Sequence, residues 1–573
     1  MTTGNTAPPG ARRRELARRT NGAPAHDASL ILPLSTAQRG LWLREQLVAG
    51  SPSYIETVAI DLAGPSDTKA LHAALDTVVQ AQDSLRTAFV VGRSGPVQVV
   101  RPSSAVHVPL DEVPHPGDPD TLDGLLDTVQ SDGLLEPLDL ARAPLLRARL
   151  YRASPERATL VLALHHLVWD GGSMPVLVDQ LARAYARADG RAVAPRPADE
   201  PGPSYADLVR RMRAQQASPD FRAAADRWAR RFADVSAGVF PWSGQADGVP
   251  PARGARRSGV IRREILPPLW QRLRAQAAEA GCTTFMTGIA CLTAALRPGP
   301  APSPVLLSAP MSVRPQEAAR QIGYLTSTVP VLVTPPEGAM RREFLEEVRR
   351  SCVESWTHRH VPLEHIVAAA GTRRAGTSPY ESVLFNCYSS PEPVQDDTGL
   401  TWTAHWLPSR SPRCDLMVSW DETGGRILAR FEYDADRIMP EDADRIADAV
   451  IRAAEDLASG AQVRYDELPR VTVRATAVPE PAPAGPAAVD VPARIRQEAE
   501  QVWRDILAID TTEPLDDEDD FFALGGRSLE AVRIAARLST GLERRVTPQL
   551  VVEAESFGDF LTLVAATETE KAQ

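Results

Sequence analysis

The first 470 residues alternate short, strongly apolar runs with longer stretches in which apolar residues recur every three or four positions. The apolar runs predict buried strands, and the clearest are 57–64, 158–166, 305–310 and 427–434. The periodic stretches predict amphipathic helices at 70–85, 174–188 and 440–458. Strands interleaved with helices indicate an α/β fold. Because one core rarely grows beyond about 250–300 residues, we expect two lobes with a cleft between them.

The pattern changes at residue 471. Residues 471–495 are rich in Pro and Ala, follow neither period, and predict a semi-extended spacer. Four shorter helical patterns then predict a small bundle, and they lie at 494–509, 528–539, 547–554 and 556–567. The predicted division of the chain is a disordered or docking tail (1–30), a first lobe (31–205), a second lobe (206–470), a linker (471–491) and the bundle (492–567).

Charge sets the bundle apart. Residues 491–573 hold 17 acidic and 9 basic side chains, so this short end carries −8 of the net −11 of the chain. The five cysteines are scattered without CxxC spacing, which is typical of reduced thiols in a cytoplasmic protein. No apolar run approaches the roughly 18 residues of a membrane span, and the basic N-terminus has no apolar segment behind it. We expect neither a membrane nor a nucleic-acid partner.

Two motifs carry candidate chemistry. In "LALHHLVWDGGS" the residues His165 and His166 end a predicted strand, and alternate strand side chains point to opposite faces. Only one histidine can therefore face a cleft, although two structural histidines remain an alternative. A metal site built on His-x3-Asp lacks a recognisable third ligand, so no metal is expected. In "DDFFALGGRSL" the residue Ser528 opens a helix after two glycines, which by itself is also ordinary helix-capping chemistry.

The order of the motifs identifies a family resemblance. "HHLVWDGGS" resembles the HHxxxDGxS signature of nonribosomal peptide synthetase condensation domains, and other segments resemble that family's motifs in the same order: 35–43, 82–89, 137–152, 204–208, 322–330 and 358–367. Gln82 and Asp83 stand where the family has His and Glu, and Ser327 stands where it has Asn. "DDFFALGGRSL" resembles the peptidyl carrier domain of the same synthetases, with Arg527 in place of His or Asp.

The resemblance implies an α/β fold of two chloramphenicol-acetyltransferase-like lobes in a V, followed by a four-helix carrier bundle. His166 would face a tunnel between the lobes as a catalytic residue, and His165 would be structural. Asp170 would be ion-paired, and Arg314 is our candidate partner because a buried carboxylate needs one. Gly171 would offer its N–H to the thioester oxygen.

The resemblance also implies that Ser528 carries a covalent 4′-phosphopantetheine arm. The expected reaction joins a carrier-bound acyl donor to an acceptor through an amide or ester bond. The expected partners are an upstream donor carrier protein, an adenylating enzyme acting in trans and a phosphopantetheinyl transferase. Condensation before carrier in the chain favours Ser528 as the acceptor site.

Other members of the histidine-motif group fit less well. Epimerisation domains continue with Ser-Trp where this chain has Ser173 and Met174, and plant-type acyltransferases need a DFGWG element that the sequence lacks. Wax-ester and acylglycerol synthases use coenzyme A thioesters and have no carrier. A platform that docks carriers without catalysis is the remaining alternative.

Overall fold

The structure is a computed structural model of the chain. It describes residues 29–47, 52–92, 95–115, 122–193, 203–233, 257–299, 303–361, 363, 382–388, 391–409, 411–460, 463–471, 493–507, 509, 515–519, 521, 524, 526, 528–542, 544, 546–554, 556–565 and 567. The predicted tail up to residue 28 and the predicted linker from residue 472 lie outside these ranges.

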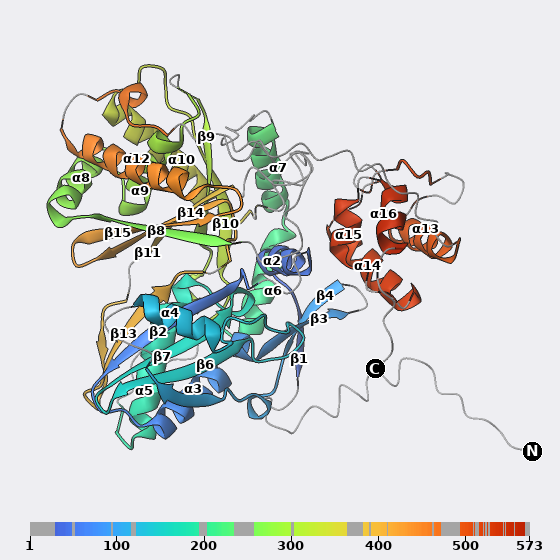
Figure 1. The fold of residues 1–573 in the computed structure, drawn as a ribbon, viewed down its shortest axis with the longest axis horizontal. Helices are drawn as coiled ribbons and strands as arrows, with labels where there is room; N and C mark the ends of the chain where they lie inside the picture. The colour runs from blue at the N-terminus through green and yellow to red at the C-terminus, as the bar shows by residue number, and fades with distance from the viewer. Residues whose placement is uncertain are drawn as a thin grey trace, which may run out of the picture.

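A six-stranded sheet of order β12-β13-β2-β7-β6-β5 forms the first lobe (Figure 1). Its strands are β2 (Ile55–Ala63), β5 (Leu110–Pro114), β6 (Leu146–Ser154), β7 (Arg157–His165), β12 (Val394–Gln395) and β13 (Thr401–Leu407). Neighbouring strands are antiparallel except β5 and β6, which are parallel.

The central strand β7 is buried on both faces. Leu160, Leu162 and Leu164 pack with the helices α3 (Thr68–Ala81) and α5 (Met174–Ala188). Val161 and Ala163 pack on the opposite side with α4 (Leu122–Ser131). Burial on both faces explains why this run is apolar at nearly every position rather than at alternate ones.

The second lobe contains another six-stranded sheet, of order β10-β9-β11-β14-β15-β8. Its strands are β8 (Ser258–Ile265), β9 (Val305–Ser312), β10 (Thr326–Val333), β11 (Val383–Tyr388), β14 (Leu416–Thr423) and β15 (Arg426–Asp434). The helices that share its main core are α8 (Pro267–Glu279), α9 (Thr284–Leu296), α10 (Arg341–Thr357) and α12 (Pro440–Ala458). On the other face of β9 and β10, α7 (Pro219–Ala233) packs its aromatic side chains against Leu306 and Leu332. Mixed sheets covered by helices confirm the predicted α/β class.

One segment crosses between the lobes. Strands β12 and β13 lie late in the chain, yet β13 pairs with β2 along its whole length, for example Trp402 with Leu62. The predicted second-lobe range 206–470 therefore contains a segment that belongs to the first sheet. Periodicity could not show this, because the apolar pattern of a strand is the same whichever sheet the strand joins.

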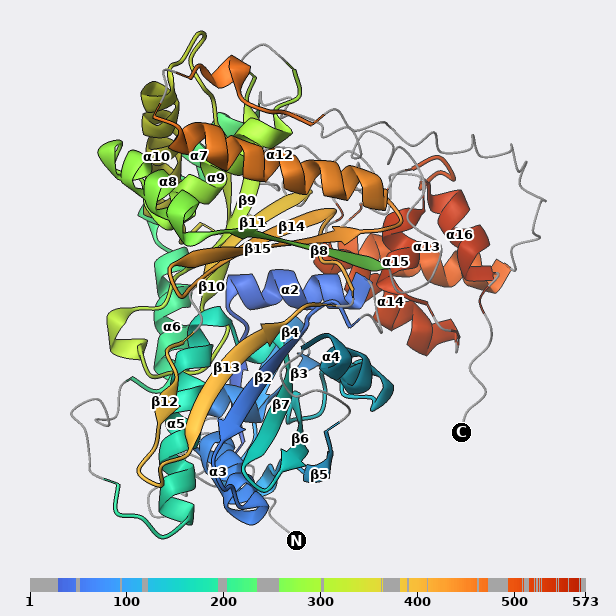
Figure 2. The ribbon, with the colours of Figure 1, turned by 60° about the vertical axis from the view of Figure 1, so that its left-hand side comes forward.

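A small sheet and two helices lie where the lobes meet (Figure 2). The sheet has the order β1-β4-β3, with β1 (Leu30–Pro33), β3 (Thr87–Gly92) and β4 (Gly95–Val100). Helix α6 (Tyr205–Gln216) packs Tyr205, Ala206 and Val209 against β1 and β4. Helix α2 (Thr36–Leu47) lies between the lobes in both views.

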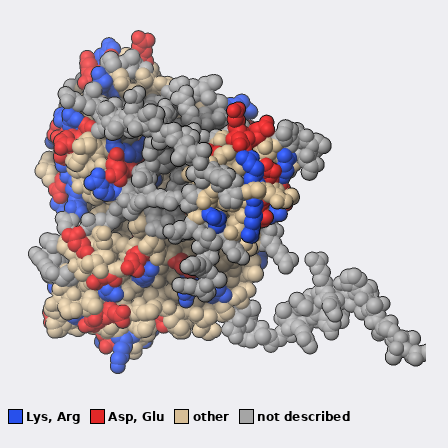
Figure 3. Space-filling model, turned by 45° about the vertical axis from the view of Figure 1, so that its right-hand side comes forward, with Lys and Arg blue, Asp and Glu red and all other residues tan. Residues whose placement is uncertain are grey.

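The C-terminal bundle is the predicted one, with helices α13 (Ala493–Leu507), α14 (Ser528–Leu542), α15 (Pro548–Glu553) and α16 (Phe557–Ala565). Trp503 is fully buried at its centre and meets Phe521, Phe557 and Phe560 with ring centroids 5.6, 4.9 and 5.3 Å away. Its surface mixes both charges where Figure 3 shows it.

The bundle packs against the first lobe. Helices α14 and α15 contact α2. Val532 of α14 is 4% exposed and belongs to the same apolar cluster as Leu41 and Trp42 of α2. The bundle and the lobes are therefore in direct apolar contact.

We expect Gly288→Ala to destabilise the protein although it replaces a helical glycine. A Cβ at Gly288 in α9 would lie 2.1 Å from the Phe385 ring. Overpacking of this kind costs about 1–3 kcal/mol, which outweighs the roughly 1 kcal/mol by which Ala favours a helix. Thermal unfolding followed by circular dichroism measures the effect.

The matched control is Gly124→Ala in α4, where an added Cβ meets nothing within 4 Å. It should stabilise by about 0.5–1 kcal/mol. Equal unfolding temperatures for the two variants would contradict the packing argument.

Candidate active site and carrier serine

The strand β7 ends at His165, and the chain then turns through two short 3-10 helices, η3 (His166–Val168) and η4 (Gly171–Ser173). The His166 N–H donates to the carbonyl oxygen of Tyr54, the residue before β2, at 2.8 Å, so the backbone there is still held to the neighbouring segment. We predicted that strand alternation separates the two rings. The strand includes only His165, and the turn that begins at His166 gives the rings different neighbours.

The ring of His165 is enclosed and fully engaged. It is 2% exposed, and its Nδ1 accepts a hydrogen bond of 3.1 Å from the Leu167 N–H. Its Nε2 lies 3.5 Å from Oε1 of Glu45 on α2. Because Nδ1 accepts, Nε2 carries the proton. Neither nitrogen is available to a substrate.

The ring of His166 is held from one side only. Its Nδ1 lies 2.9 Å from the Trp169 carbonyl oxygen and 3.6 Å from Oε2 of Glu56. Both neighbours are acceptors, so Nδ1 carries the proton and the Nε2 lone pair is left to act as a base. The Tyr324 ring meets the imidazole edge-on, with centroids 4.9 Å apart.

Burial, rather than the neighbouring charges, favours the neutral form of His166. Burial lowers its pKa below the usual value; the Glu56 carboxylate acts in the opposite direction, and the Arg413 guanidinium adds to the decrease. Burial alone would raise the pKa of Glu56, but the charge of a protonated His166, the Arg413 guanidinium, and the hydrogen bonds from Arg413 and Trp169 lower it below its usual value. Arg413 and Trp169 still hold the carboxylate ionised when the His166 ring is neutral. The site therefore holds a neutral imidazole beside an ionised carboxylate.

Glu56 and Arg413 were not predicted from the sequence. Arg413 Nη1 lies 2.8 Å from Oε1 of Glu56, and Trp169 Nε1–H donates to its Oε2 at 2.6 Å. Glu56 stands just before the predicted apolar run 57–64, and because that run holds a second acidic residue, Asp61, the sequence did not single Glu56 out. Nothing local marks Arg413, because it reaches the site from the loop before β14.

Asp170 connects the two lobes. Its Oδ1 accepts from Arg314 Nη2 at 2.6 Å and from the Ser173 hydroxyl at 2.8 Å. Its Oδ2 accepts from the Leu325 N–H at 2.8 Å and the Thr326 hydroxyl at 3.1 Å. The side chains of the ion pair are 2% and 10% exposed. Asp170 is thus fully used as an acceptor and is not free to act as an acid.

Gly171 lies beside an aromatic surface. A Cβ added there would lie 3.9 Å from Cζ2 of Trp406, an ordinary contact. Trp406 in turn stands 5.4 Å from Trp169 and 5.8 Å from Tyr388, measured between ring centroids. The fold itself therefore leaves room for a side chain at Gly171.

The other motif residues mostly support this loop. The Gln38 amide donates to the Leu167 carbonyl oxygen at 3.2 Å, and the Gln82 side chain accepts from the Ile322 N–H at 2.9 Å. Ser327 is 3% exposed on β10, and its hydroxyl has no hydrogen-bond partner among the described residues. Most of the motif at 358–367 beyond residue 361 lies outside the described residues.

The surroundings of Ser528 fit a phosphodiester. Ser528 is the first residue of the 15-residue helix α14, whose N-terminal N–H groups attract an anion. The Gly526 N–H donates to the Phe521 carbonyl oxygen at 2.9 Å, and a Cβ on Gly526 would lie 2.4 Å from the Phe521 ring. The glycine before the serine is thus required by packing. When attached, the phosphopantetheine group supplies a thiol that holds an acyl group as a thioester.

The residues that the structure describes offer no metal site and no disulfide. No group of three His, Cys, Asp or Glu there could hold a metal, and all five cysteines are free. No single described helix is long and apolar enough to cross a membrane; α8 and α9 together reach the length and composition but bend by 97°.

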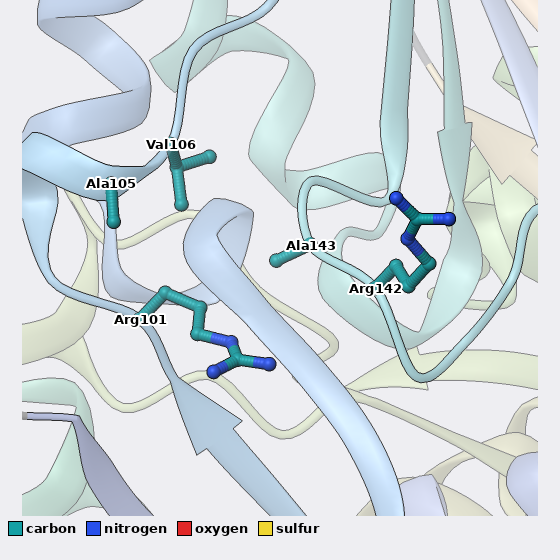
Figure 4. Close-up of a pocket in the computed structure, with 5 residues that line it drawn as sticks. All are labelled: Arg101, Ala105, Val106, Arg142 and Ala143. Atoms are coloured by element: carbon teal, nitrogen blue, oxygen red, sulfur yellow. The ribbon is translucent and has the colours of Figure 1, made fainter.

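A pocket of about 260 Å³ lies in the first lobe, and neither histidine lines it (Figure 4). It is lined by Arg101, Ala105, Val106, Arg142 and Ala143, from the segment after β4 and the loop before β6. Among the described residues, no hydrogen bond or ion pair joins one of these lining residues to His166, Glu56 or Asp170.

The fold and the histidine loop define the class of two-lobed acyltransferases that work on thioesters. The chain belongs to the condensation-domain family: the model of that domain matches residues 29–476, and the model of the phosphopantetheine attachment site matches 497–564. Condensation domains of nonribosomal peptide synthetases form amide bonds, and phosphopantetheine is attached to a serine of the second domain.

Known proteins of this kind are similar to the chain. Chondramide synthase cmdD of Chondromyces crocatus is 28% identical over 408 residues, which are 71% of this chain and 10% of that protein. Phosphinothricin tripeptide synthetase PhsC of Streptomyces viridochromogenes is 27% identical over 454 residues, which are 77% of this chain and 40% of that protein. The chain thus spans less than half of these relatives.

Solved structures agree on the fold. The first condensation domain of the calcium-dependent antibiotic synthetase, in complex with a substrate analogue, superimposes with a TM-score of 0.66 at 24% identity and covers 77% of this chain and 99% of that one. SgcC5 of Streptomyces globisporus, in complex with (R)-(-)-1-(2-naphthyl)-1,2-ethanediol and sucrose, gives 0.60 at 21% identity, covering 74% of this chain and 99% of that one. These likenesses confirm the predicted chloramphenicol-acetyltransferase-like lobes.

We expect Asp170→Asn to cost about 3–5 kcal/mol of stability, because it leaves the Arg314 charge buried without a partner. The control is Glu346→Gln, which breaks the exposed pair of Arg342 and Glu346 (2.9 Å, side chains 75% and 46% exposed) and should leave stability nearly unchanged, because solvent screens an exposed ion pair. Urea unfolding measures both. Similar losses in the two variants would contradict the assignment of Asp170 as the connection between the lobes.

Proposed function

We propose that the chain condenses an acyl donor, delivered as a thioester by an upstream carrier protein, with an acceptor held on its own Ser528. The product is an amide or an ester. The observation that carries the proposal is the neutral His166 ring, whose Nδ1 is fixed by acceptors and whose Nε2 is left as a base. Membership of the condensation-domain family supports the reaction class.

His166 would act on the acceptor nucleophile. Its Nε2 takes the proton as the acceptor nitrogen or oxygen bonds to the thioester carbon, and it returns that proton to the thiolate when the carbon–sulfur bond breaks. The Gly171 N–H would stabilise the negative charge that develops on the carbonyl oxygen. His165, Asp170 and Arg314 would hold the loop in place, since their polar atoms are engaged within the protein.

The importance of the base depends on the acceptor. An α-amine has a pKa of about 7.7–8.0, so at pH 7 roughly a tenth is neutral and deprotonation costs only about 1 kcal/mol. Positioning can contribute far more, because well-oriented groups reach effective molarities of about 10⁵ M or higher. A hydroxyl is hardly ionised at pH 7 and needs a base in the transition state.

The contact between carrier and lobe supports Ser528 as the acceptor site. Val532 lies one turn after Ser528 on α14 and packs with Trp42 of α2. A short tether between the domains also raises the local carrier concentration to about the millimolar range when it spans the distance.

Loading in trans is part of the proposal. The two family models that match the chain, over residues 29–476 and 497–564, are those of a condensation domain and a phosphopantetheine attachment site, and neither of these domains activates an amino acid. We therefore propose an adenylating enzyme and a phosphopantetheinyl transferase as partners in trans.

Intact mass spectrometry tests the function directly. The chain is treated with a broad-specificity phosphopantetheinyl transferase and coenzyme A, and then with candidate adenylating enzymes and a loaded donor carrier. We expect one phosphopantetheine on the wild type, none on Ser528→Ala, and a condensed product on Ser528. Product that forms equally well with His166→Ala for amine and hydroxyl acceptors would indicate a platform for docking carriers.

We predict that His166→Ala loses nearly all ester formation but only about tenfold or less of amide formation.

Because the pKa of His166 is lowered, its base form persists below the usual pKa of about 6.5. The rate with a hydroxyl acceptor should therefore be flat from pH 8 to about 6.5 and fall only at lower pH. A profile that declines already between pH 8 and 7 would contradict the neutral assignment.

We also predict that Val532→Asp weakens condensation on the tethered carrier, because it places a charge in an apolar contact. The control is Ala536→Asp, which adds the same charge at an exposed position of the same helix. Both variants should accept phosphopantetheine normally. Equal condensation rates in the two would show that this contact does not serve the reaction.

A further inference from the structure

Each of the two adjacent histidines has a carboxylate of its own, but at different ring nitrogens. Glu45 Oε1 lies 3.5 Å from Nε2 of His165, whose Nδ1 already accepts a backbone hydrogen bond. Glu56 Oε2 lies 3.6 Å from Nδ1 of His166. The Glu45 pair leaves no free nitrogen, whereas the Glu56 pair leaves Nε2 free. Only Glu56 and His166 form an arrangement in which a carboxylate lies beside one ring nitrogen while the other nitrogen is free to act as a base.

Both carboxylate oxygens of Glu56 are hydrogen-bonded within the protein. Its Oε2 accepts from Trp169 Nε1–H at 2.6 Å, its Oε1 accepts from Arg413 at 2.8 Å, and its side chain is 13% exposed. Any effect of Glu56 on the reaction must therefore pass through His166. A carboxylate in this place stabilises the positive charge that forms when Nε2 takes a proton.

Arg413 limits that effect. Its Nε donates to the Ser53 carbonyl oxygen at 2.8 Å, and its guanidinium lies 5.7 Å from the centre of the Tyr54 ring. The charged and titratable groups that face His166 are Glu56 from β2, Arg413 from the loop before β14, Asp170 from its own loop and Tyr324 from the segment before β10. Glu56 and Arg413 thus act on His166 with opposite signs.

We propose that Glu56 is a positioning residue that equips His166 to deprotonate a hydroxyl acceptor, with Arg413 setting the strength of its effect. The proposal rests on the proposed function, in which Nε2 takes the acceptor proton. For an amine, which loses its proton easily, the stabilised imidazolium matters little. For a hydroxyl, removal of the proton is part of the rate-determining step, so the stabilised imidazolium lowers the barrier of that step. Glu56 therefore favours ester over amide formation rather than binding either substrate.

The first test needs no substrate. Diethyl pyrocarbonate acylates neutral imidazole nitrogens, and peptide mass spectrometry follows His166 in the tryptic peptide 158–183 across pH. Below the pKa, the rate follows the neutral fraction, which changes tenfold for each pH unit. We expect Glu56→Gln to lower the pKa of His166 further, because the carboxylate that favours the imidazolium is lost, and so to make His166 react several-fold faster at low pH. Arg413→Gln should shift it upward and react more slowly.

The controls separate this effect from loss of structure. Glu45→Gln removes the matched carboxylate beside His165 and should leave the His166 titration unchanged. The double variant Glu56→Gln/Arg413→Gln removes both charges, so no buried charge lacks a partner, and it should titrate between the two single variants. Shifts in the same direction for both single variants, or no shift in either, would overturn the proposal.

The second test measures selectivity. Ser528 is loaded with alanyl- or lactoyl-pantetheine from the synthetic coenzyme A thioesters, which differ only in the nucleophilic atom, and benzoyl-N-acetylcysteamine serves as donor. Glu56→Gln should lower kcat for the lactoyl acceptor at least tenfold and for the alanyl acceptor less than threefold, with KM for the donor unchanged. Equal losses would refute the positioning role. If the wild type forms neither product, the proposed function fails, while the titration still decides whether Glu56 acts on His166.

Discussion

The buried ion pair of Asp170 and Arg314 is the interaction on which the site depends. A carboxylate that is 2% exposed is stable only if donors replace its lost water, and here four donors do so from both lobes. Burying such an ion pair adds little net stability, but its hydrogen bonds can form in only one arrangement of the loop and the second lobe. The loop that carries His166 is thus fixed to the second lobe as well as to its own strand.

The site lies at the end of the apolar strand β7, next to the buried ion pair of Asp170 and Arg314. Up to His165, the side chains of β7 are buried on both faces of the first sheet. One residue later, His166 has polar neighbours on one side and an aromatic edge on the other. The change from strand to turn at this point explains why two identical neighbours have different protonation patterns. His165 is a backbone acceptor inside the core, and His166 keeps a free nitrogen.

Ion pairs are placed differently at the site and in the C-terminal bundle. Around the site in the lobes, ion pairs are buried, as in Asp170 with Arg314 and Glu56 with Arg413. In the bundle, the described pairs are exposed, such as Arg496 with Asp517 at 2.6 Å, and contribute little to stability. The bundle is instead held by its aromatic centre at Trp503 and meets the lobes through the apolar Val532. A domain attached through a small apolar contact can leave and return, which suits the carrier role that we propose for the bundle.

The sequence by itself determined the α/β class, the four-helix bundle, the motif residues and the pairing of Asp170 with Arg314, because periodicity, turn chemistry and family motifs are local or ordered along the chain. Only the tertiary structure decided that residues 394–407 join the first sheet and that Glu56 and Arg413 surround His166. Strand alternation correctly separated the two histidines but for the wrong reason, since the strand stops between them. These features depend on contacts between segments far apart in the chain, and a contact of that kind leaves no period or motif at either end.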